Sequence, residues 1–311
     1  YANERKQFGT SISSFGAIQQ KLAEMTTKTW VAESATYRAG QDIENNIERL
    51  LAEGVSPSEA KLKGVEEYAI ECALLKVLGS EVGSYVSDEG VQIFGGMGYS
   101  ADAPMEAAYR DVRIARIYEG TNEINRMHSV AMLLKKALKG ELDLMQPAMQ
   151  VADELMEIPS FDTADYSVLF TEEKEMISKF KKALLMVAGK AVQKYGMDIE
   201  DEQELLMNAS DMMIEIYATE SAVLRAEKLA QTKGEEAAAH QINMAKLYLN
   251  NAAEYIARSG REAIYSFAEG DEQRMMLMGL KRFTKINNPI NLKEVRRSIA
   301  AKVIEENKYC F

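Results

Sequence analysis

Apolar residues recur every three or four positions along most of this chain, and that spacing predicts helices. In the first half, helical patterns cover residues 17–51, 57–86, 89–94 and 122–138. Gly54 and the following Ser56-Pro57 separate the first two patterns, because glycine ends a helix and proline is accepted in the first turn of the next. We expect the segment between Gly95 and Gly120 to be tight and irregular.

The stretch from residue 139 to residue 171 has a different composition. It contains Pro147 and Pro159, a methionine-rich amphipathic segment over residues 142–156, and then polar residues typical of turns. We interpret it as a linker that carries a short helix. Helical spacing then returns more strongly, over residues 176–195, 205–229, 237–267, 271–283 and 291–307.

No segment shows the alternation of apolar and polar residues that strands require, so we predict an all-α fold. Only 5 prolines occur, while 18 methionines and many alanines, leucines, glutamates and lysines favour long helices. The expected architecture is two successive antiparallel helical bundles with short connections. Its parts are a bundle over residues 1–138, the linker over 139–171 and a helical extension over 172–311.

Charge and composition exclude several classes of function. The chain has 37 Lys and Arg against 48 Asp and Glu, a net charge of −11, which argues against a general nucleic-acid binder. No apolar run approaches the roughly 18 residues of a membrane span, and we identify no secretion leader. The two cysteines lie far apart and fit a reducing compartment, and two histidines leave little material for a metal site.

Two segments carry residues that a helical bundle does not need. The first is Arg5-Lys6-Gln7-Phe8-Gly9, and the second runs from Val91 to Arg126. Together they resemble the acyl-CoA dehydrogenase flavoenzymes. The motifs that carry the resemblance are Arg5-Lys6-Gln7-Phe8-Gly9, Ala17-Ile18-Gln19-Gln20-Lys21-Leu22-Ala23, Gln92-Ile93-Phe94-Gly95-Gly96-Met97-Gly98-Tyr99, Tyr109-Arg110-Asp111 and Ile117-Tyr118-Glu119-Gly120-Thr121-Asn122-Glu123-Ile124.

These motifs occur in the order and at the spacing of the family, over about residues 1–138. In that family a helical domain and a β-domain precede a C-terminal four-helix bundle, and the resemblance implies that the first half of this chain is that bundle. The chain begins at Tyr1 inside a motif, and no part of it resembles the β-domain. We therefore expect a piece of a longer protein, inactive when alone.

The resemblance assigns Glu119 the role of catalytic base. In the family this carboxylate removes the α-proton of an acyl-CoA thioester inside a water-poor pocket, while the β-hydride passes to the flavin and a trans-2-enoyl-CoA forms. Gly120 is implied to permit the close approach of substrate. A bare glutamate at this place would otherwise be read as a favourable charge near a helix N-terminus.

The resemblance also implies which residues contact FAD. Arg5 matches the residue that pairs with the pyrophosphate, although a solvated charge on a helix is the alternative interpretation. Gln7 and Phe8 match contacts made to the FAD of the neighbouring subunit. Thr121 is also a good N-cap, so its role is partly structural. The remaining positions that match cofactor contacts are Gln92, Gly96 and Glu123.

One departure points to a branch of the family. Many members have a glutamine where this chain has Gly16, and glycine together with the extension after residue 140 is similar to the very-long-chain branch. That likeness implies a homodimer, a long-chain acyl-CoA substrate in fatty-acid β-oxidation and electron-transfer flavoprotein as the acceptor. The compartment would be the cytoplasm of a bacterium or the mitochondrial matrix of a eukaryote.

Three alternatives stay open at this level. Residues 142–156 are expected to pack against their own bundle, with contact to a membrane surface or the substrate entrance as the less favoured interpretation; their acidic residues oppose anionic lipid. The enzyme alternative is a relative of the acyl-CoA oxidases. The alternative from another class is a non-catalytic helical module used for dimerisation or docking.

Overall fold

The computed structural model describes residues 1–156 and 165–311, and these residues are almost entirely helical. The helices of the first half are α1 (Gly16–Ala52), α2 (Pro57–Glu67), α3 (Ala69–Phe94), α4 (Gly96–Tyr99), α5 (Pro104–Arg113) and α6 (Asn122–Leu138). Those of the second half are α7 (Met145–Met156), α8 (Thr171–Tyr195), α9 (Gln203–Lys233), α10 (Ala239–Phe267), α11 (Gly270–Thr284) and α12 (Leu292–Glu306). The all-α fold class is confirmed.

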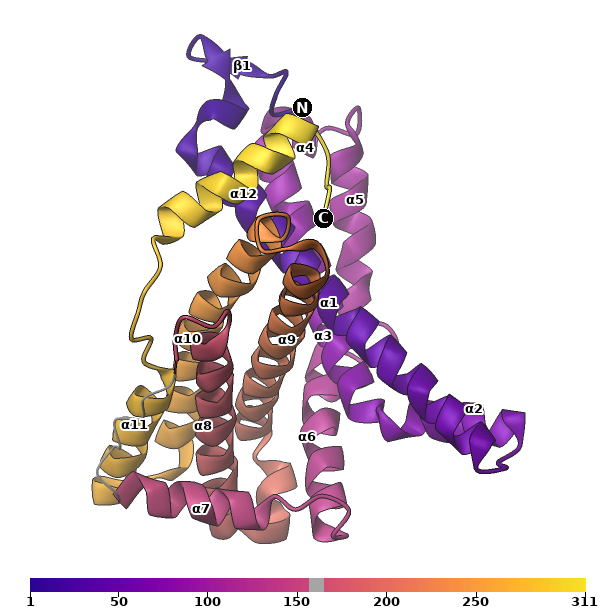
Figure 1. The fold of residues 1–311 in the computed structure, drawn as a ribbon, viewed down its shortest axis with the longest axis vertical. Helices are drawn as coiled ribbons and strands as arrows, with labels where there is room; N and C mark the ends of the chain where they lie inside the picture. The colour runs from indigo at the N-terminus through magenta and orange to yellow at the C-terminus, as the bar shows by residue number, and fades with distance from the viewer. Residues whose placement is uncertain (157–164) are drawn as a thin grey trace.

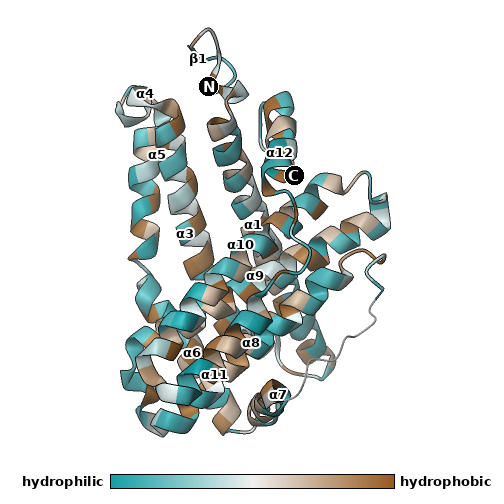
Figure 2. Cartoon of the chain, turned by 90° about the vertical axis from the view of Figure 1, so that its left-hand side faces the viewer, coloured by the Kyte–Doolittle hydropathy of each residue, from teal (hydrophilic) through white to brown (hydrophobic). Residues whose placement is uncertain are grey.

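The helices surround the antiparallel pair α9 and α10 (Figure 1). On one side α8 and α11 pack against this pair, and α7 crosses the lower end. On the other side α1, α3 and α6 contact α9, and α5 lies along α3. Most helices are brown on one side and teal on the other in Figure 2, which is the amphipathic pattern that the sequence spacing predicts.

A single continuous core joins the two halves of the chain. Trp30 of α1, Phe180 of α8, Met212 of α9, Met244 of α10 and Ile299 of α12 all belong to it and are fully buried. Apolar burial of this kind is the main source of folding free energy. The two halves therefore stabilise each other, and the boundaries proposed at residues 138 and 171 stay predictions.

The C-terminal helix α12 is fixed to α1 by a partly buried ion pair. Arg296 donates to the carboxylate of Glu24 at 2.6 Å, and Asn251 of α10 donates to the same carboxylate at 3.2 Å. The two charged side chains are only 20% and 10% exposed. Arg296 therefore holds α12 against α1.

The structure corrects three expectations in the first half. The pattern over residues 57–86 is interrupted at Tyr68, and α3 continues without a break through the separate helix expected at 89–94. The segment expected to be irregular before Gly120 contains α4, α5 and a 3₁₀ turn over Ile114–Arg116.

The N-terminal motif forms a short hairpin. Strands β1 (Lys6–Gln7) and β2 (Thr10–Ser11) pair antiparallel, with Lys6 opposite Ser11 and Gln7 opposite Thr10. Arg5 therefore precedes a strand, and its alternative interpretation as a charge on a helix is wrong. Two-residue strands are too short to give an alternating sequence pattern, which is why the sequence does not reveal them.

One face of helix α7 packs against its own bundle. Val151 is 4% exposed, and the position of a Cβ at Gly189 of α8 lies 3.0 Å from Cβ of Ala148, so glycine permits the close approach of the two helices. Met145 and Met149 stay exposed. Among the described residues, no helix is long and apolar enough to cross a lipid bilayer.

A partly buried carboxyl group between α9 and α10 makes the stability of the fold depend on pH. Burial raises the pKa of Glu215 from its ordinary 4.5 to about 7, although Lys28 and the hydroxyl of Tyr248, which donates to the carboxylate, act in the opposite direction. The unfolded chain loses this proton at lower pH than the folded chain. The free energy of unfolding therefore falls as pH rises from about 4.5 to about 7 and then levels.

We expect Glu215→Gln to remove that pH dependence. Above neutral pH the free energy of unfolding of the variant should exceed that of the parent by an amount of the order of 3 kcal/mol. Urea unfolding of both proteins at several pH values measures the effect. Glu262→Gln, at an exposed position of α10, is the control and should follow the parent curve. Parallel curves for parent and Glu215→Gln would show that Glu215 ionises normally.

Candidate functional site

Glu119 lies in a strained turn immediately before α6. Its φ is +55° and that of the following Gly120 is +81°. The left-handed region is comfortable for glycine but costs a residue with a Cβ about 1 kcal/mol or more. Of the four described residues other than glycine with positive φ, two are Phe8 and Glu119, both singled out from the sequence. Backbone strain at these places is typical of functional sites.

Hydrogen bonds from two helices hold this turn in place. The carbonyl oxygen of Gly120 accepts from Nζ of Lys76 on α3 at 2.6 Å and from Nδ2 of Asn125 on α6 at 2.9 Å. Lys76 also donates to Oδ1 of Asn122 at 2.8 Å. A Cβ at Gly120 would lie 3.0 Å from Nδ2 of Asn125. The turn is therefore anchored to α3 and α6 at one carbonyl.

Thr121 caps α6, as the sequence predicts. Its Oγ1 accepts from the backbone N–H of Ile124 at 3.3 Å. The pKa of Glu123 is lowered by hydrogen bonds from the backbone N–H of Glu123 and from the Thr121 hydroxyl. This carboxylate is therefore ionised, and its negative charge stabilises the N-terminus of α6. Thr121 and Glu123 also line a small pocket of about 190 Å³ together with Arg113, Arg116 and Glu81.

Within the described residues the Glu119 side chain is exposed to solvent. The water-poor pocket that the resemblance implies around this carboxylate is thus not formed by this chain. Three apolar neighbours, Ile117, Tyr118 and Ile124, are about half exposed as well, at 49%, 53% and 54%. The turn is a projecting feature surrounded by uncovered apolar side chains.

The other predicted cofactor residues form a second group near the N-terminus. Arg5 and Gln7 are exposed in the hairpin, and Phe8 at its tip is 95% exposed. The ring of Tyr1 stacks on Phe94 at 4.1 Å between centroids, and its hydroxyl donates to the Phe94 carbonyl at 3.1 Å. This contact places the hairpin beside the end of α3, which carries Gln92, and beside Gly96 at the start of α4.

The two groups are separated along α3. Ser80 accepts from Asn122 beside the Glu119 turn, while Gln92 lies twelve residues further along the same helix. At a rise of 1.5 Å per residue this is roughly 18 Å. The chain therefore brings the sequence-predicted residues into two largely exposed groups separated along α3, and not into one enclosed pocket.

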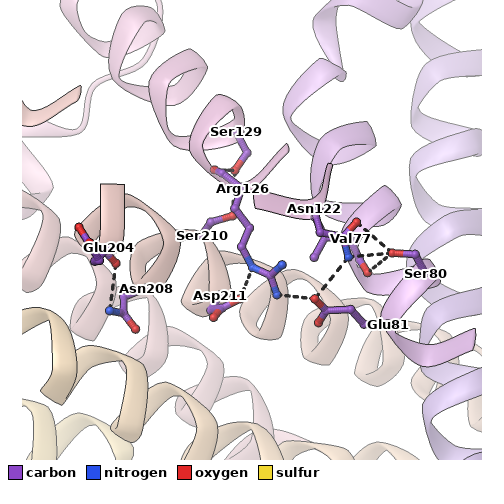
Figure 3. A network of polar contacts seen from close by, with 10 residues as sticks. All are labelled: Val77, Ser80, Glu81, Asn122, Arg126, Ser129, Glu204, Asn208, Ser210 and Asp211. Atoms are coloured by element: carbon purple, nitrogen blue, oxygen red, sulfur yellow. Dashed lines mark hydrogen bonds and ion pairs between the residues drawn. The ribbon is translucent and has the colours of Figure 1, made fainter. Parts of the chain in front are cut away.

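An ion-pair network fixes α6 to both neighbouring helices (Figure 3). Arg126 donates through Nε to Asp211 of α9 at 2.7 Å and through Nη2 to Glu81 of α3 at 2.8 Å. The Arg126 side chain is 11% exposed and that of Asp211 is 19% exposed. Ser129 and Ser210 share a buried hydrogen bond of 3.0 Å one turn away.

Sequence reasoning did not identify the residues that support the turn. Asn122 and Arg126 lie within the quoted motif region at a spacing of four, so one face of a helix was a usable signal. Lys76 and Asp211 come from distant segments and offer none. Among the described residues no group of His, Cys, Asp or Glu is arranged to hold a metal ion.

The network makes a quantitative prediction. Asp211→Ala removes one of the two carboxylates that pair with Arg126 and leaves its guanidinium with little access to water. We therefore expect the free energy of unfolding to fall by about 3 kcal/mol. Glu53→Ala, which removes the exposed partner of Arg49, is the matched control and should cost less than about 0.5 kcal/mol. Urea unfolding measures both, and equal losses would show that burial of the Arg126 pair is unimportant.

Comparisons with known proteins agree with the motifs. Two family models match, both described as "Acyl-CoA dehydrogenase, C-terminal domain", over residues 1–134 and 179–282. A probable acyl-CoA dehydrogenase of Bacillus subtilis is 41% identical over 309 residues, which are 99% of this chain and 52% of that protein. The mitochondrial very long-chain specific acyl-CoA dehydrogenase of Rattus norvegicus is 27% identical over 92% of this chain and 42% of its own length.

Solved structures agree as well. A crystal structure of an acyl-CoA dehydrogenase complexed with FAD from Bacillus anthracis has a TM-score of 0.95 at 42% identity, over 100% of this chain and 52% of that one. An acyl-CoA oxidase of Yarrowia lipolytica has a TM-score of 0.63 at 16% identity, over 98% of this chain and 44% of that one, and so shares the fold. This chain spans about half the length of the relatives it matches. It belongs to the acyl-CoA dehydrogenase family and corresponds to its C-terminal region.

Proposed function

We propose that this chain supplies the catalytic base and one side of the FAD site in an FAD-dependent acyl-CoA dehydrogenase that acts on long-chain acyl-CoA in fatty-acid β-oxidation. The observation that carries the proposal is the Glu119 turn. The backbone of Glu119 is kept at positive φ in a turn whose Gly120 carbonyl is bound by Lys76 and Asn125, at an energetic cost that no contact of Glu119 within the described residues repays.

The chemistry requires such a carboxylate. The α-proton of a thioester is weakly acidic, so the base must lie within hydrogen-bonding reach of it and away from water. As that proton leaves, negative charge collects on the thioester oxygen and needs a fixed donor. The backbone N–H of Glu119 donates to no acceptor within the described residues, so it is free for this role.

Cover for Glu119 must come from outside the described residues. The exposed side chains of Ile117, Tyr118 and Ile124 are an apolar surface that such cover would bury. The chain corresponds to about half of its relatives, and the rest of the enzyme or a second copy would supply the cover. Desolvation of Glu119 would then belong to the complete enzyme.

The residues near the N-terminus fit FAD. Arg5 is exposed and forms no ion pair with the described residues, so its guanidinium is available to a pyrophosphate. Gly95 has φ +60°, and neither Gly95 nor Gly96 has a heavy atom within 4 Å of a Cβ position, so a ligand can approach the backbone there. Gln92 lies in this group, whereas Thr121 and Glu123 lie beside the Glu119 turn. Bound FAD would supply the acceptor for the β-hydride.

Two partners follow from the same proposal. Phe8, 95% exposed at the tip of the hairpin, fits a contact to the FAD of a second subunit, which supports a homodimer. Electron-transfer flavoprotein is the proposed acceptor of the electrons. The proposed cellular compartment of this dimer is the cytoplasm of a bacterium or the mitochondrial matrix of a eukaryote.

We expect Glu119→Gln in the full-length enzyme to lower kcat by roughly 10²–10⁴-fold, since the amide cannot take the proton. Dye reduction with a long-chain acyl-CoA measures this rate, and the visible flavin spectrum shows that FAD content is unchanged. Glu53→Gln, at an exposed position at the end of α1, should retain full activity.

Other outcomes select the alternatives. Full activity of Glu119→Gln would favour the non-catalytic helical module. Loss of activity combined with rapid reoxidation of the reduced flavin by O₂ in the parent protein would favour an acyl-CoA oxidase, whose fold this chain shares.

We further expect the 311-residue chain alone to bind FAD weakly and to have no turnover, because the residues proposed to contact FAD are largely exposed and form no enclosed site. Equilibrium dialysis against FAD measures the affinity. A yellow preparation with one FAD per chain and dye-reducing activity would contradict this expectation.

A further inference from the structure

A large apolar pocket lies in the second half of the chain, apart from the Glu119 turn. It has a volume of about 610 Å³ and is enclosed by the C-terminal half of α6, the first half of α7, α8 and the 3₁₀ segment Gly196–Asp201. Figure 1 shows α7 crossing the lower end of α8, and the loop before α7 leads back to the lower end of α6. The volume is within the range of about 300–1,000 Å³ that is usual for small-molecule sites. We call it the α6–α7–α8 pocket.

Small residues create this space. Ala131 of α6, Ala148 of α7 and Ala188 of α8 face it, where larger side chains would fill it. At Gly189, by contrast, α7 and α8 touch, since a Cβ there would lie 3.0 Å from Ala148. Contact at one point and open space beside it make a pocket with a rigid wall.

The chemistry of the walls selects an aliphatic ligand. Fourteen of the seventeen lining residues are apolar or glycine. A peptide or a nucleotide would bury polar groups there without partners, at a cost of a few kcal/mol each. A hydrocarbon chain has no such groups and restores the dispersion contacts that the walls lack.

The rim provides a cation for the head group of such a ligand. Lys136 and Lys139 pair with Glu67 and Glu141, whereas Lys135 lines the pocket and forms no ion pair with the described residues. An exposed, unpaired ammonium at the edge of an apolar cavity attracts a carboxylate or phosphate.

The other ionisable residues of the lining are His128, also on α6, and Glu200 on the 3₁₀ segment. Glu200 repels an anion, which places the head group on the α6 side of the rim. Leu138 and Met145 line the pocket and are 71% and 62% exposed, so they mark its mouth. The apolar interior and the cationic edge together define the ligand.

We propose that the α6–α7–α8 pocket binds the single aliphatic chain of an anionic amphiphile, with Lys135 at its head group. Glu119 and Gly120 lie beyond the opposite end of α6, so this site is separate from the proposed site of catalysis. A free fatty acid, an acyl-CoA and a lysophospholipid share this chemistry.

The test is a titration of the 311-residue chain with cis-parinaric acid, a fatty acid that fluoresces in apolar surroundings. We expect saturable binding of one molecule per chain. Ala188→Phe fills the pocket and should weaken binding by at least about tenfold. Ala108→Phe is the matched control, because Ala108 lines a different apolar groove of about 560 Å³ between α1, α3 and α5, and it should bind as the parent does.

A second pair of variants tests the head group and leaves the helices intact. Lys135→Glu should weaken binding of the probe and of dodecanoate, both carboxylates, about tenfold, and leave the dissociation constant of dodecanol, obtained from displacement with the probe's weaker affinity taken into account, unchanged. Lys61→Glu on exposed α2 makes the same change of charge and should have no effect. Circular dichroism of each variant shows that the helices are retained.

Competition identifies the natural source. Dodecanoate, dodecanoyl-CoA and a lysophospholipid with the same chain are compared as competitors of the probe. The compound that displaces the probe at the lowest concentration identifies the class of natural ligand. Absence of saturable binding would overturn the proposal. So would equal weakening by Ala188→Phe and Ala108→Phe, or equal effects of Lys135→Glu on dodecanoate and dodecanol.

Discussion

The guanidinium of Arg126 fixes the arrangement on which the candidate site depends. It joins α6 to α3 through Glu81 and to α9 through Asp211, at a place where water has little access. The Glu119 turn immediately precedes α6, so its position follows from that of the helix. Because Asp211 belongs to the C-terminal half, that half takes part in placing the proposed base. Two bundles along the sequence thus act as one structure.

Exposure is the second feature that the candidate residues share. Glu119, Arg5, Gln7 and Gln92 are all exposed, although their types and strained turns are those of a binding site. Residues of a surface that another polypeptide covers share these properties: their backbone is held by the helices beneath them, and their side chains are exposed. The strain at Glu119 is held by contacts to its neighbours, and it persists without the cover.

Local spacing in the sequence predicts most helices, because each buries one face and the apolar residues mark it. The limits of α6 agree with the prediction. Helix α5 was missed because it has no buried residue; its signals are Pro104 in the first turn and the ion pair of Glu106 with Arg110, not apolar spacing. The pairing of Arg126 with Asp211 spans 85 residues, so no local pattern contains it.

Helix α1 is an early segment whose partners are late ones. Trp30 is fully buried under α9, and Glu24 is bound by Asn251 and by Arg296, 227 and 272 residues further along. During synthesis on the ribosome this face therefore stays uncovered until almost the whole extension has emerged. A truncated or stalled product would expose the same apolar surface, so we expect chaperones to bind the nascent chain.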